Sequence, residues 1–378
     1  MKKIRVLFCL DAFEGSATGG TETQFWLLIG ALPRDQFDVA LALLRPSKYL
    51  RDNPPPFPVI DIGVRSMASP LSWWKLLRFA FRARREGYRV AHTYLNDVSI
   101  CLPPFLRFAG IRVIVSRRDL GFWYSPRILK ALRAVRRFVD RVVVNSTAVG
   151  EVTMREEGYT RDQVETIYNG HYCKLDKADG ARAPAGRDAR NRILLCLVAN
   201  LKPIKRIEDA ISVLARVRAA GEDVGLVLIG GDGRGRHGES YRAELEAHAE
   251  KLGVAGAVYY TGRVPDPASV VRSADIGLLC SDSEGLPNSV IEYMLLEKPC
   301  VCTDVGGMRD VVVPGVTGEL VKVGDVDAMA GHILRMCRDE AYRRKLGESA
   351  RVIAEQKFSV DALTQAHATL YQRLLVAP

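Results

Sequence analysis

The sequence predicts an α/β fold built from two domains, each with a doubly wound parallel sheet. The first observation is length, because 378 residues are enough for about two domains with separate cores. The second is a series of short apolar runs followed by helical patterns, which is typical of parallel strands buried on both faces. The third is that a new series of such runs begins at Ile193, after the polar residues 173–191.

Each element follows from this pattern in chain order. In the first half, strands are expected around residues 4–10, 39–44, 90–96, 113–119, 142–146 and 164–170. In the second half, strands are expected around residues 193–199, 224–229, 259–264, 275–280 and 299–303. Helices are expected over residues 25–29, 72–85, 127–140, 207–219, 290–296 and much of 327–377. The predicted domains are therefore residues 1–172 and 192–355, joined by a linker at 173–191.

Composition excludes several classes of protein. No run of eighteen apolar residues is present, and a membrane-spanning helix needs about that many. The N-terminal apolar run is too short for a signal peptide and ends at Asp11. The eight cysteines show neither the spacing of a zinc site nor that of a small disulfide scaffold, which favours reduced thiols. We therefore expect a cytoplasmic protein.

The positive charge is unevenly distributed. The net charge is +10, and the excess of basic residues lies within residues 1–190. This asymmetry favours an anionic partner for the first domain, such as a membrane surface, a lipid diphosphate or a nucleic acid. No recognised nucleic-acid-binding motif is present, so a nucleic acid is not expected.

Residues 72–85 are predicted to form an amphipathic helix. One face carries the basic residues Lys75, Arg78, Arg82 and Arg85, and the other carries Trp73, Leu76, Leu77, Ala80 and Phe81. Such a helix can lie on an anionic bilayer. Its apolar face can equally be part of the core, with the arginines in solvent, and the sequence leaves both interpretations open.

The most informative stretch runs from Glu284 to Glu292 and has the sequence E-G-L-P-N-S-V-I-E. It joins a predicted strand to a helix for which Asn288 or Ser289 is the expected N-cap. The helix N-terminus offers backbone N–H groups and a positive dipole end, which suit a phosphate. Glu284 on the turn and Glu292 one helical turn further can border one crevice. Carboxylates accept hydrogen bonds from hydroxyls, so the pattern indicates a sugar on one side and a ribose on the other.

This stretch resembles the E-x7-E signature of retaining glycosyltransferases of family 4, which have the GT-B fold of two Rossmann-like domains facing a cleft. The resemblance implies that Glu284 holds hydroxyls of the donor sugar and that Glu292 holds the ribose of the nucleotide. It implies that the residues between them line the diphosphate, largely through backbone N–H groups: Gly285, Leu286, Pro287, Asn288 and Ser289. It also implies that a last helix, at residues 356–378, crosses back to the first domain.

Other loops resemble the same family. Gly19 and Gly20 follow the first strand, where the family's backbone approaches donor and acceptor, although an ordinary turn before a helix explains them too. Lys205 matches a lysine that binds the donor diphosphate. Asn200 stands where the family has an arginine, so Arg206 or Arg118 is expected to meet the remaining phosphate charge. The resemblance also places two further residues at the donor: Gly230 and Val264.

His92, Arg118 and Asp119 lie in the runs that end two predicted strands of the first domain. Because ligands bind beyond the carboxyl ends of strands in open parallel sheets, all three are placed to reach the donor. The family commonly has a histidine at the position of Arg118, where it touches the donor sugar, so this chain departs from the pattern. For His92 a structural role at a strand end is the alternative.

The resemblance implies transfer of a sugar from a nucleoside diphosphate sugar, with UDP favoured over GDP, to a hydroxyl of a glycan or lipid-linked glycan. The enzyme would be a hexosyltransferase (EC 2.4) of polysaccharide or lipopolysaccharide assembly, on the cytoplasmic face of the membrane. The predicted catalytic residues are Lys205, Glu284, Arg118 and Asp119. No cofactor and no metal are expected, and Asp325 and Asp327 are interpreted as capping a helix. The alternatives are a GT-B epimerase or phosphorylase, and a protein that binds nucleotide sugars or anionic polymers without catalysis.

Overall fold

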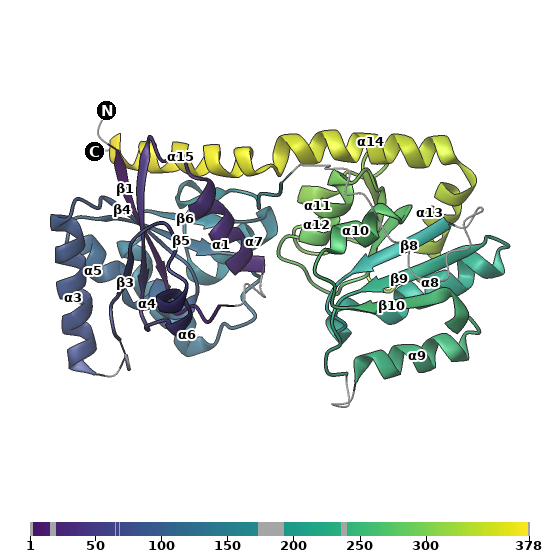
Figure 1. Ribbon diagram of the computed structural model, residues 1–378, viewed down its shortest axis with the longest axis horizontal. Coiled ribbons are helices and arrows are strands. Elements are labelled where there is room, and N and C mark those ends of the chain that lie inside the picture. The colour runs from purple at the N-terminus through teal and green to yellow at the C-terminus, as the bar shows by residue number, and fades with distance from the viewer. Residues whose placement is uncertain are drawn as a thin grey trace. The chain divides into compact units, whose positions relative to one another are not determined.

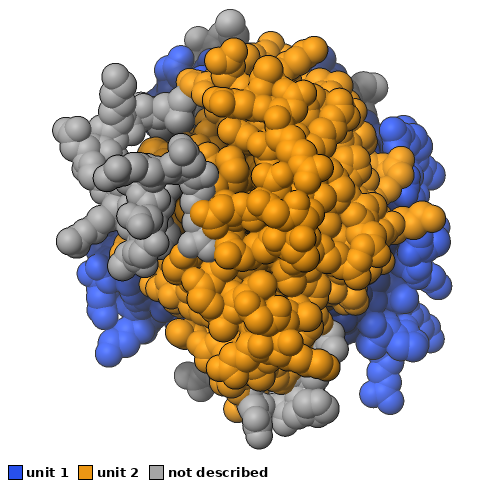
Figure 2. All heavy atoms as spheres, turned by 90° about the vertical axis from the view of Figure 1, so that its right-hand side faces the viewer, with its two compact units in different colours: residues 1–170, 360–378 blue, residues 171–359 orange. Residues whose placement is uncertain are grey.

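The computed structural model describes residues 3–15, 20–64, 66–67, 69–172, 193–235 and 240–376. The predicted linker at 173–191 and Gly19 lie outside the described residues. The chain divides into two compact units, which Figure 2 colours separately. The first unit contains residues 1–170 and 360–378, and the second contains residues 171–359.

The first unit is built on a seven-stranded sheet in which every pairing is parallel. Its strand order is β3-β2-β1-β4-β5-β6-β7 (Figure 1). The strands are β1 (Ile4–Leu10), β2 (Phe37–Leu43), β3 (Val59–Asp61), β4 (Val90–Thr93), β5 (Arg112–Arg117), β6 (Arg141–Val144) and β7 (Val164–Thr166). The order reverses between β1 and β4, so the carboxyl ends of these two strands form the topological switch point of the sheet.

Helices cover both faces of this sheet. They are α1 (Gly20–Ala31), α2 (Lys48–Asp52), α3 (Pro70–Arg85), α4 (Asn96–Cys101), α5 (Pro103–Phe108), α6 (Pro126–Val135), η1 (Arg136–Phe138), α7 (Thr147–Glu157), η2 (Arg161–Gln163) and α15 (Val360–Val376). On β1, Leu7 and Cys9 pack in the core shared with α3 and α5, while Val6 and Phe8 pack in the core shared with α1 and α15. Burial on both faces explains why the strands are apolar at nearly every position.

The second unit has a six-stranded parallel sheet in the order β10-β9-β8-β11-β12-β13. The strands are β8 (Ile193–Val198), β9 (Val224–Ile229), β10 (Val258–Gly262), β11 (Ile276–Leu279), β12 (Cys300–Thr303) and β13 (Gly318–Val321). The helices are η3 (Pro203–Lys205), α8 (Ile207–Ala219), α9 (Tyr241–Lys251), η4 (Ala255–Ala257), α10 (Pro267–Arg272), α11 (Asn288–Leu295), α12 (Met308–Val311), α13 (Val326–Arg338) and α14 (Glu340–Lys357). Here the switch point lies between β8 and β11.

These two sheets confirm the predicted fold class of two doubly wound parallel-sheet domains. The predicted interpretation of Asp325 is also confirmed, because its side chain accepts a hydrogen bond from the Ala328 N–H and caps α13. The second basic helix is shorter than predicted: α6 ends at Val135, and η1 continues the turn in 3-10 form. No helix of the described residues is both long and apolar enough to cross a membrane.

The prediction for the faces of α3 was partly wrong. The buried side is formed by Leu76, Phe79, Ala80 and Ala83. The side chains of Trp73, Leu77 and Phe81, which were predicted to share one apolar face with Leu76 and Ala80, are exposed together with Leu71 and Trp74. The helix therefore has two apolar faces, and only one of them packs on the sheet.

Candidate active site

The switch point of the second unit brings Lys205 and Glu284 together. Lys205 ends η3 after β8, and Glu284 lies on the turn after β11. Glu284 Oε1 accepts hydrogen bonds from Lys205 Nζ and from Ser281 Oγ, both at 2.6 Å. The Asp282 N–H donates to the Ile204 carbonyl at 2.9 Å, which ties the two loops to each other. A cation and a carboxylate that can contact a ligand therefore lie where open parallel sheets bind ligands.

The turn at Glu284 is supported by the two glycines that follow β12. Gly306 has a φ of +50°, and a Cβ built there would lie 1.7 Å from the Glu284 carbonyl oxygen. The Gly307 N–H donates to the carbonyls of Glu284 and Gly285, at 3.3 and 3.1 Å. A side chain at position 306 would therefore clash with the backbone that positions Glu284.

The α11 helix begins at Asn288, with Pro287 as its N-cap residue. The prediction of Asn288 or Ser289 as the N-cap was wrong, because both residues are already helical. Within the described residues the N-cap position of this helix provides no side-chain cap, whereas side chains cap several other helices of the unit. The positive end of the helix dipole thus lies at Asn288, directly after the buried Leu286 and Pro287. The N-cap residue is a proline, so it provides no carboxylate or hydroxyl at this end. This arrangement suits an anionic group.

Glu292 lies in the second turn of α11. Burial, together with the charge of Asp266, raises the pKa of the Glu292 carboxyl to about 7. A desolvated carboxyl whose pKa is close to neutral pH can accept hydrogen bonds from hydroxyls, and these hydrogen bonds stabilise its charged form. The environment of Glu292 therefore fits a hydroxyl-binding group better than it fits a solvated helix residue.

The prediction that Arg206 meets a phosphate does not fit its surroundings. Its Nε donates to Asp209 Oδ2 at 2.7 Å, and its Nη1 lies 3.4 Å from Asp282 Oδ1. The hydrogen bond to Asp209 raises the pKa of Arg206 despite the opposing effect of burial. Two carboxylates thus already hold this guanidinium.

The other residues predicted to bind the donor in this unit lie at strand ends. Asn200 is exposed two residues beyond β8, and Val264 is half-buried two residues beyond β10. Gly230 directly follows β9, and a Cβ there would lie 1.9 Å from the carbonyl oxygen of Ala199, which directly follows β8. Close packing is thus sufficient to explain the glycine at position 230. The predicted contacts of Gly230, Asn200 and Val264 with a donor stay predictions.

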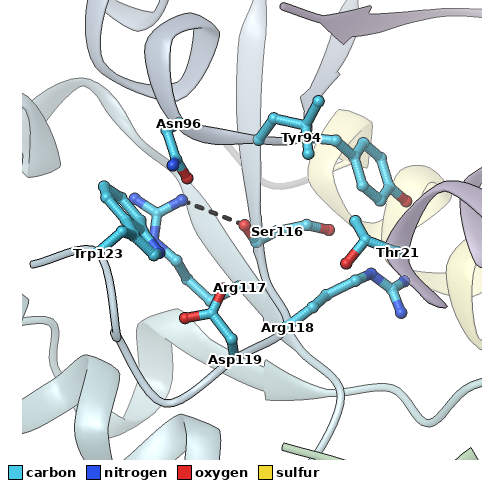
Figure 3. Close-up of a pocket in the computed structure, with 9 residues that line it drawn as sticks. Thr21, Tyr94, Asn96, Ser116, Arg117, Arg118, Asp119 and Trp123 are labelled. Carbon is cyan, nitrogen blue, oxygen red and sulfur yellow. Dashed lines mark hydrogen bonds between the residues drawn. The ribbon is translucent and has the colours of Figure 1, made fainter. Parts of the chain in front are cut away.

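A pocket lies at the switch point of the first unit, beyond the carboxyl ends of β4 and β5 (Figure 3). It contains Arg118 and Asp119, as predicted from their place after a strand. Its other lining residues are Thr21, Tyr94, Leu95, Asn96, Ser116, Arg117 and Trp123. The sequence analysis did not single out these residues, although Asn96 ends a predicted strand and Thr21 follows Gly20, the first residue of α1.

Two consecutive arginines of this pocket have opposite surroundings. Arg117 forms a buried bidentate pair with Glu157, in which Nε to Oε1 is 2.6 Å and Nη2 to Oε2 is 2.9 Å. Burial alone would lower the pKa of Arg117, but the charge of Glu157 raises it. Figure 3 shows Arg117 directed toward Trp123 and Arg118 directed toward Thr21 and Tyr94. Arg118 donates from Nη1 to Asn169 Oδ1 at 2.5 Å.

His92 does not reach the pocket surface. Its side chain is 0 % exposed, its Nδ1 lies 2.8 Å from the Tyr371 hydroxyl of α15, and its Nε2 lies 2.8 Å from Ser116 Oγ. Burial, with the charges of His367 and Arg118, lowers the pKa of His92 well below its usual value. The predicted direct contact with a donor therefore does not fit this position. His92 instead supports Ser116, which lines the pocket.

The described residues contain no group of three or more His, Cys, Asp or Glu side chains placed to hold a metal ion. The expectation that no metal is needed stays a prediction, because it concerns the reaction.

Two family models match this chain. The model described as "Glycosyltransferase Family 4" matches residues 18–173, and the model described as "Glycosyl transferases group 1" matches residues 183–352. Among solved structures, the Anabaena protein HepE in complex with UDP superposes with a TM-score of 0.80 over 98 % of this chain and 100 % of HepE, at 21 % identity. The fold is that of the GT-B class, and both matching models describe glycosyltransferases. The chain belongs to glycosyltransferase family 4.

Two curated relatives illustrate the range of similarity. N-acetyl-alpha-D-glucosaminyl L-malate synthase of Bacillus anthracis is 26 % identical over 56 % of this chain and 54 % of its own length. UDP-Gal:alpha-D-GlcNAc-diphosphoundecaprenol alpha-1,3-galactosyltransferase of Escherichia coli is 21 % identical over 82 % of both chains. The chain thus spans about half the length of the first relative, and about a third of the length of two others.

Proposed function

We propose that this protein transfers a sugar from a nucleoside diphosphate sugar, UDP before GDP, to a hydroxyl of a glycan or lipid-linked glycan, with retention of anomeric configuration. The observation that carries the proposal is the Lys205–Glu284 pair beside the uncapped start of α11. Lys205 and the backbone N–H groups at that helix start stabilise the negative charge that grows on the departing diphosphate. Glu284 orients the sugar and Glu292 accepts the ribose hydroxyls.

In the proposed step, the bond between the anomeric carbon and the diphosphate oxygen breaks as the acceptor oxygen bonds to that carbon. The acceptor proton passes to the departing phosphate, so no protein nucleophile is needed. The diphosphate leaves with the bonding electron pair, and the groups around it are fixed before the reaction begins. Support for the donor class comes from the relative in Escherichia coli, which is named for a UDP sugar, and from HepE, which was solved with UDP.

Calorimetry with UDP, GDP, ADP and CDP tests the donor site, using the wild-type protein and the Glu292→Gln variant. We expect one nucleotide to bind and the substitution to weaken its binding, because a neutral amide is a poorer acceptor for hydroxyls than a carboxylate. If none of the four nucleotides binds, the proposed donor site is contradicted. The matching sugar nucleotide, supplied without an acceptor, then separates transfer from epimerisation, because an epimerase converts it alone. A phosphorylase would show the visible absorbance of pyridoxal phosphate.

The acceptor is proposed to be presented at the cytoplasmic face of an anionic membrane. Support comes from α3, where Trp74 is 54 % and Phe81 44 % exposed beside exposed Arg78, Arg82 and Arg85. Exposed aromatic and basic side chains on one helix suit the interface of an anionic bilayer. The relative in Escherichia coli is named for an acceptor on diphosphoundecaprenol, a lipid carrier. Sedimentation with phosphatidylglycerol vesicles at low salt tests this, and protein that stays in the supernatant there contradicts it.

A further inference from the structure

Arg118 carries a guanidinium group for which the described residues provide no carboxylate. Its Nη1 donates to the Asn169 amide oxygen, and its Cζ lies 5.6 Å from the centre of the Tyr94 ring. Its Nε and Nη2 atoms are buried and find no hydrogen-bond acceptor within the described part of the chain. Buried donors without acceptors are destabilising, and native proteins rarely retain them without a reason.

Several described side chains that interact with this guanidinium are neutral. They include the phenols of Tyr94 and Tyr371 and the two buried imidazoles. Burial is the main reason why the pKa of His367 is lowered to about 3 and that of His92 well below its usual value, and the charge of Arg118 contributes to both shifts. These side chains therefore do not compensate the positive charge. The adjacent Arg117, by contrast, is fully paired with Glu157.

The opposite end of the pocket has a different chemistry. Figure 3 shows Asn96, Asp119 and Trp123 on the side away from the Arg118 guanidinium, together with the Arg117 guanidinium, whose charge Glu157 compensates. Asp119 Oδ1 accepts a hydrogen bond from the Gly121 N–H at 2.7 Å, which fixes its carboxylate. A carboxylate and an amide bind hydroxyls, and an indole offers a flat apolar surface to the ring that carries them. The Asp119 charge also disfavours an anion at that end, so the pocket is polarised.

We propose that this pocket binds a carbohydrate that carries an anionic group, a carboxylate or a phosphate, whose charge pairs with Arg118 and whose hydroxyls face Asp119 and Asn96. A planar guanidinium with two unused donors matches both anions in a bidentate geometry. That the ligand is a carbohydrate rests on the proposed function, whereas the recognition of an anion by Arg118 does not. The anion can belong to the donor, as the carboxylate of a uronic acid, or to the acceptor, as a uronate or a sugar phosphate.

Two titrations of the full-length protein in 0.15 M NaCl test the proposal and separate the two sources. The first compares D-glucuronate and D-glucose 6-phosphate with D-glucose by ligand-observed NMR, with UDP present and absent. The second compares UDP-glucuronate with UDP-glucose by calorimetry. An anionic acceptor predicts at least tenfold tighter binding of a free anionic sugar than of glucose, also in the presence of UDP. An anionic donor predicts the same preference for UDP-glucuronate over UDP-glucose.

Variants of Arg118 test whether this side chain causes the preference for anionic over neutral sugars. Arg118→Gln is expected to bind anionic and neutral sugars within twofold of each other, and Arg118→Lys to keep a reduced preference. Arg344→Gln is the control, because it removes the same charge from an exposed side chain of the second unit. Thermal unfolding verifies that each variant is folded. If Arg118→Gln does not fold, the comparison is made with Arg118→Lys instead.

No preference for the anionic ligand in either titration, or a preference that Arg118→Gln retains, overturns the inference. Of the two titrations, the one with free sugars is independent of the nucleotide site. If no nucleotide binds, the proposed transfer fails, while the free-sugar titration still decides the role of Arg118.

Discussion

Lys205 Nζ and Glu284 Oε1 are 2.6 Å apart, although the two residues come from loops that follow different strands of the second unit. The pair is half-buried, with side-chain exposures of 24 % and 12 %. A donor diphosphate that engages Lys205 has to share this cation with Glu284 or replace it. In the proposed reaction the pair holds the lysine in place before the donor arrives, which is the preorganisation that stabilisation of a leaving group requires.

Lys205→Ala is expected to lower kcat for sugar transfer by roughly 10²- to 10³-fold, because it removes a preorganised cation from the leaving diphosphate. Binding of the nucleoside diphosphate should weaken as well. Lys202→Ala is the control, since Lys202 is an exposed cation on the same loop. Steady-state kinetics with the donor found by calorimetry provide the measurement. Equal kcat values in the two variants would show that Lys205 has no role at the leaving group.

Glu292 should make nucleotide binding depend on pH. Its pKa is raised to about 7, by burial first and then by Asp266, so the carboxyl becomes a stronger acceptor for hydroxyls as the pH rises through that value. The affinity of the wild type for its nucleotide is expected to increase between pH 6 and pH 8 by more than that of Glu292→Gln. Comparison with the variant corrects for the titration of the nucleotide's own phosphate, which affects both proteins equally. Parallel pH profiles for the two proteins would contradict a ribose contact.

The same raised pKa predicts a change in stability without ligand. Below about pH 4.5 the Glu292 carboxyl is protonated in both the folded and the unfolded state, so it has no effect. As the pH rises toward 7 the unfolded state ionises first, and the folded state loses up to about 3 kcal/mol relative to it. Glu292→Gln lacks this loss. Thermal unfolding should therefore show the variant gaining stability relative to the wild type from pH 5 to pH 8.

The backbone pattern of this protein was largely predictable, because a buried parallel strand leaves a continuous apolar run in the sequence. The α8 helix and the strands β1 and β9 fall at their predicted bounds. Short elements such as β3 and β13 were missed, since three or four residues carry too little pattern. Family 4 membership was predicted from Glu284 to Glu292 and is confirmed by the matches.

Side-chain environments were less predictable, because they depend on partners that are distant in the sequence. The burial of His92 depends on Tyr371, which lies near the end of the chain. The dipeptide Arg-Arg does not reveal that Arg117 pairs with Glu157 while two nitrogens of Arg118 find no acceptor among the described residues. For α3, helical periodicity located the basic residues, but the packing of Leu76 and Phe79 decided which apolar side chains stay in solvent.

Arg117→Gln is expected to destabilise the first unit by roughly 3–5 kcal/mol, because it leaves the buried Glu157 carboxylate without its cation, with the Tyr124 hydroxyl still donating to it. Denaturant unfolding gives the free-energy difference. The exposed pair of Arg82 and Glu86 is the control, and Arg82→Gln should cost less than about 0.5 kcal/mol. Replacing Arg117 and Glu157 together by Met and Leu should restore much of the loss, since no uncompensated charge remains. A small loss in the single variant would indicate that Glu157 becomes protonated or solvated.

The exposed face of α3 should determine how tightly the protein binds anionic vesicles. Substituting both Trp74 and Phe81 with Ser removes apolar surface that already lies in solvent, so the fold should keep its stability while vesicle affinity falls by about tenfold or more. Val352→Ser is the control, because it removes an exposed apolar side chain from the second unit. Vesicle sedimentation gives the affinities.

Salt separates the two contributions to that binding. Arg78 and Arg85 attract the anionic surface through charges that about 0.5 M NaCl screens strongly, whereas insertion of Trp74 and Phe81 is not screened. The wild type should therefore lose part of its vesicle affinity on raising the salt, and the ratio of wild-type to double-variant affinity should stay nearly constant. If the double variant binds as tightly as the wild type at low salt, the aromatic face of α3 does not enter the membrane. The basic charge of the first unit would then account for the attraction by itself.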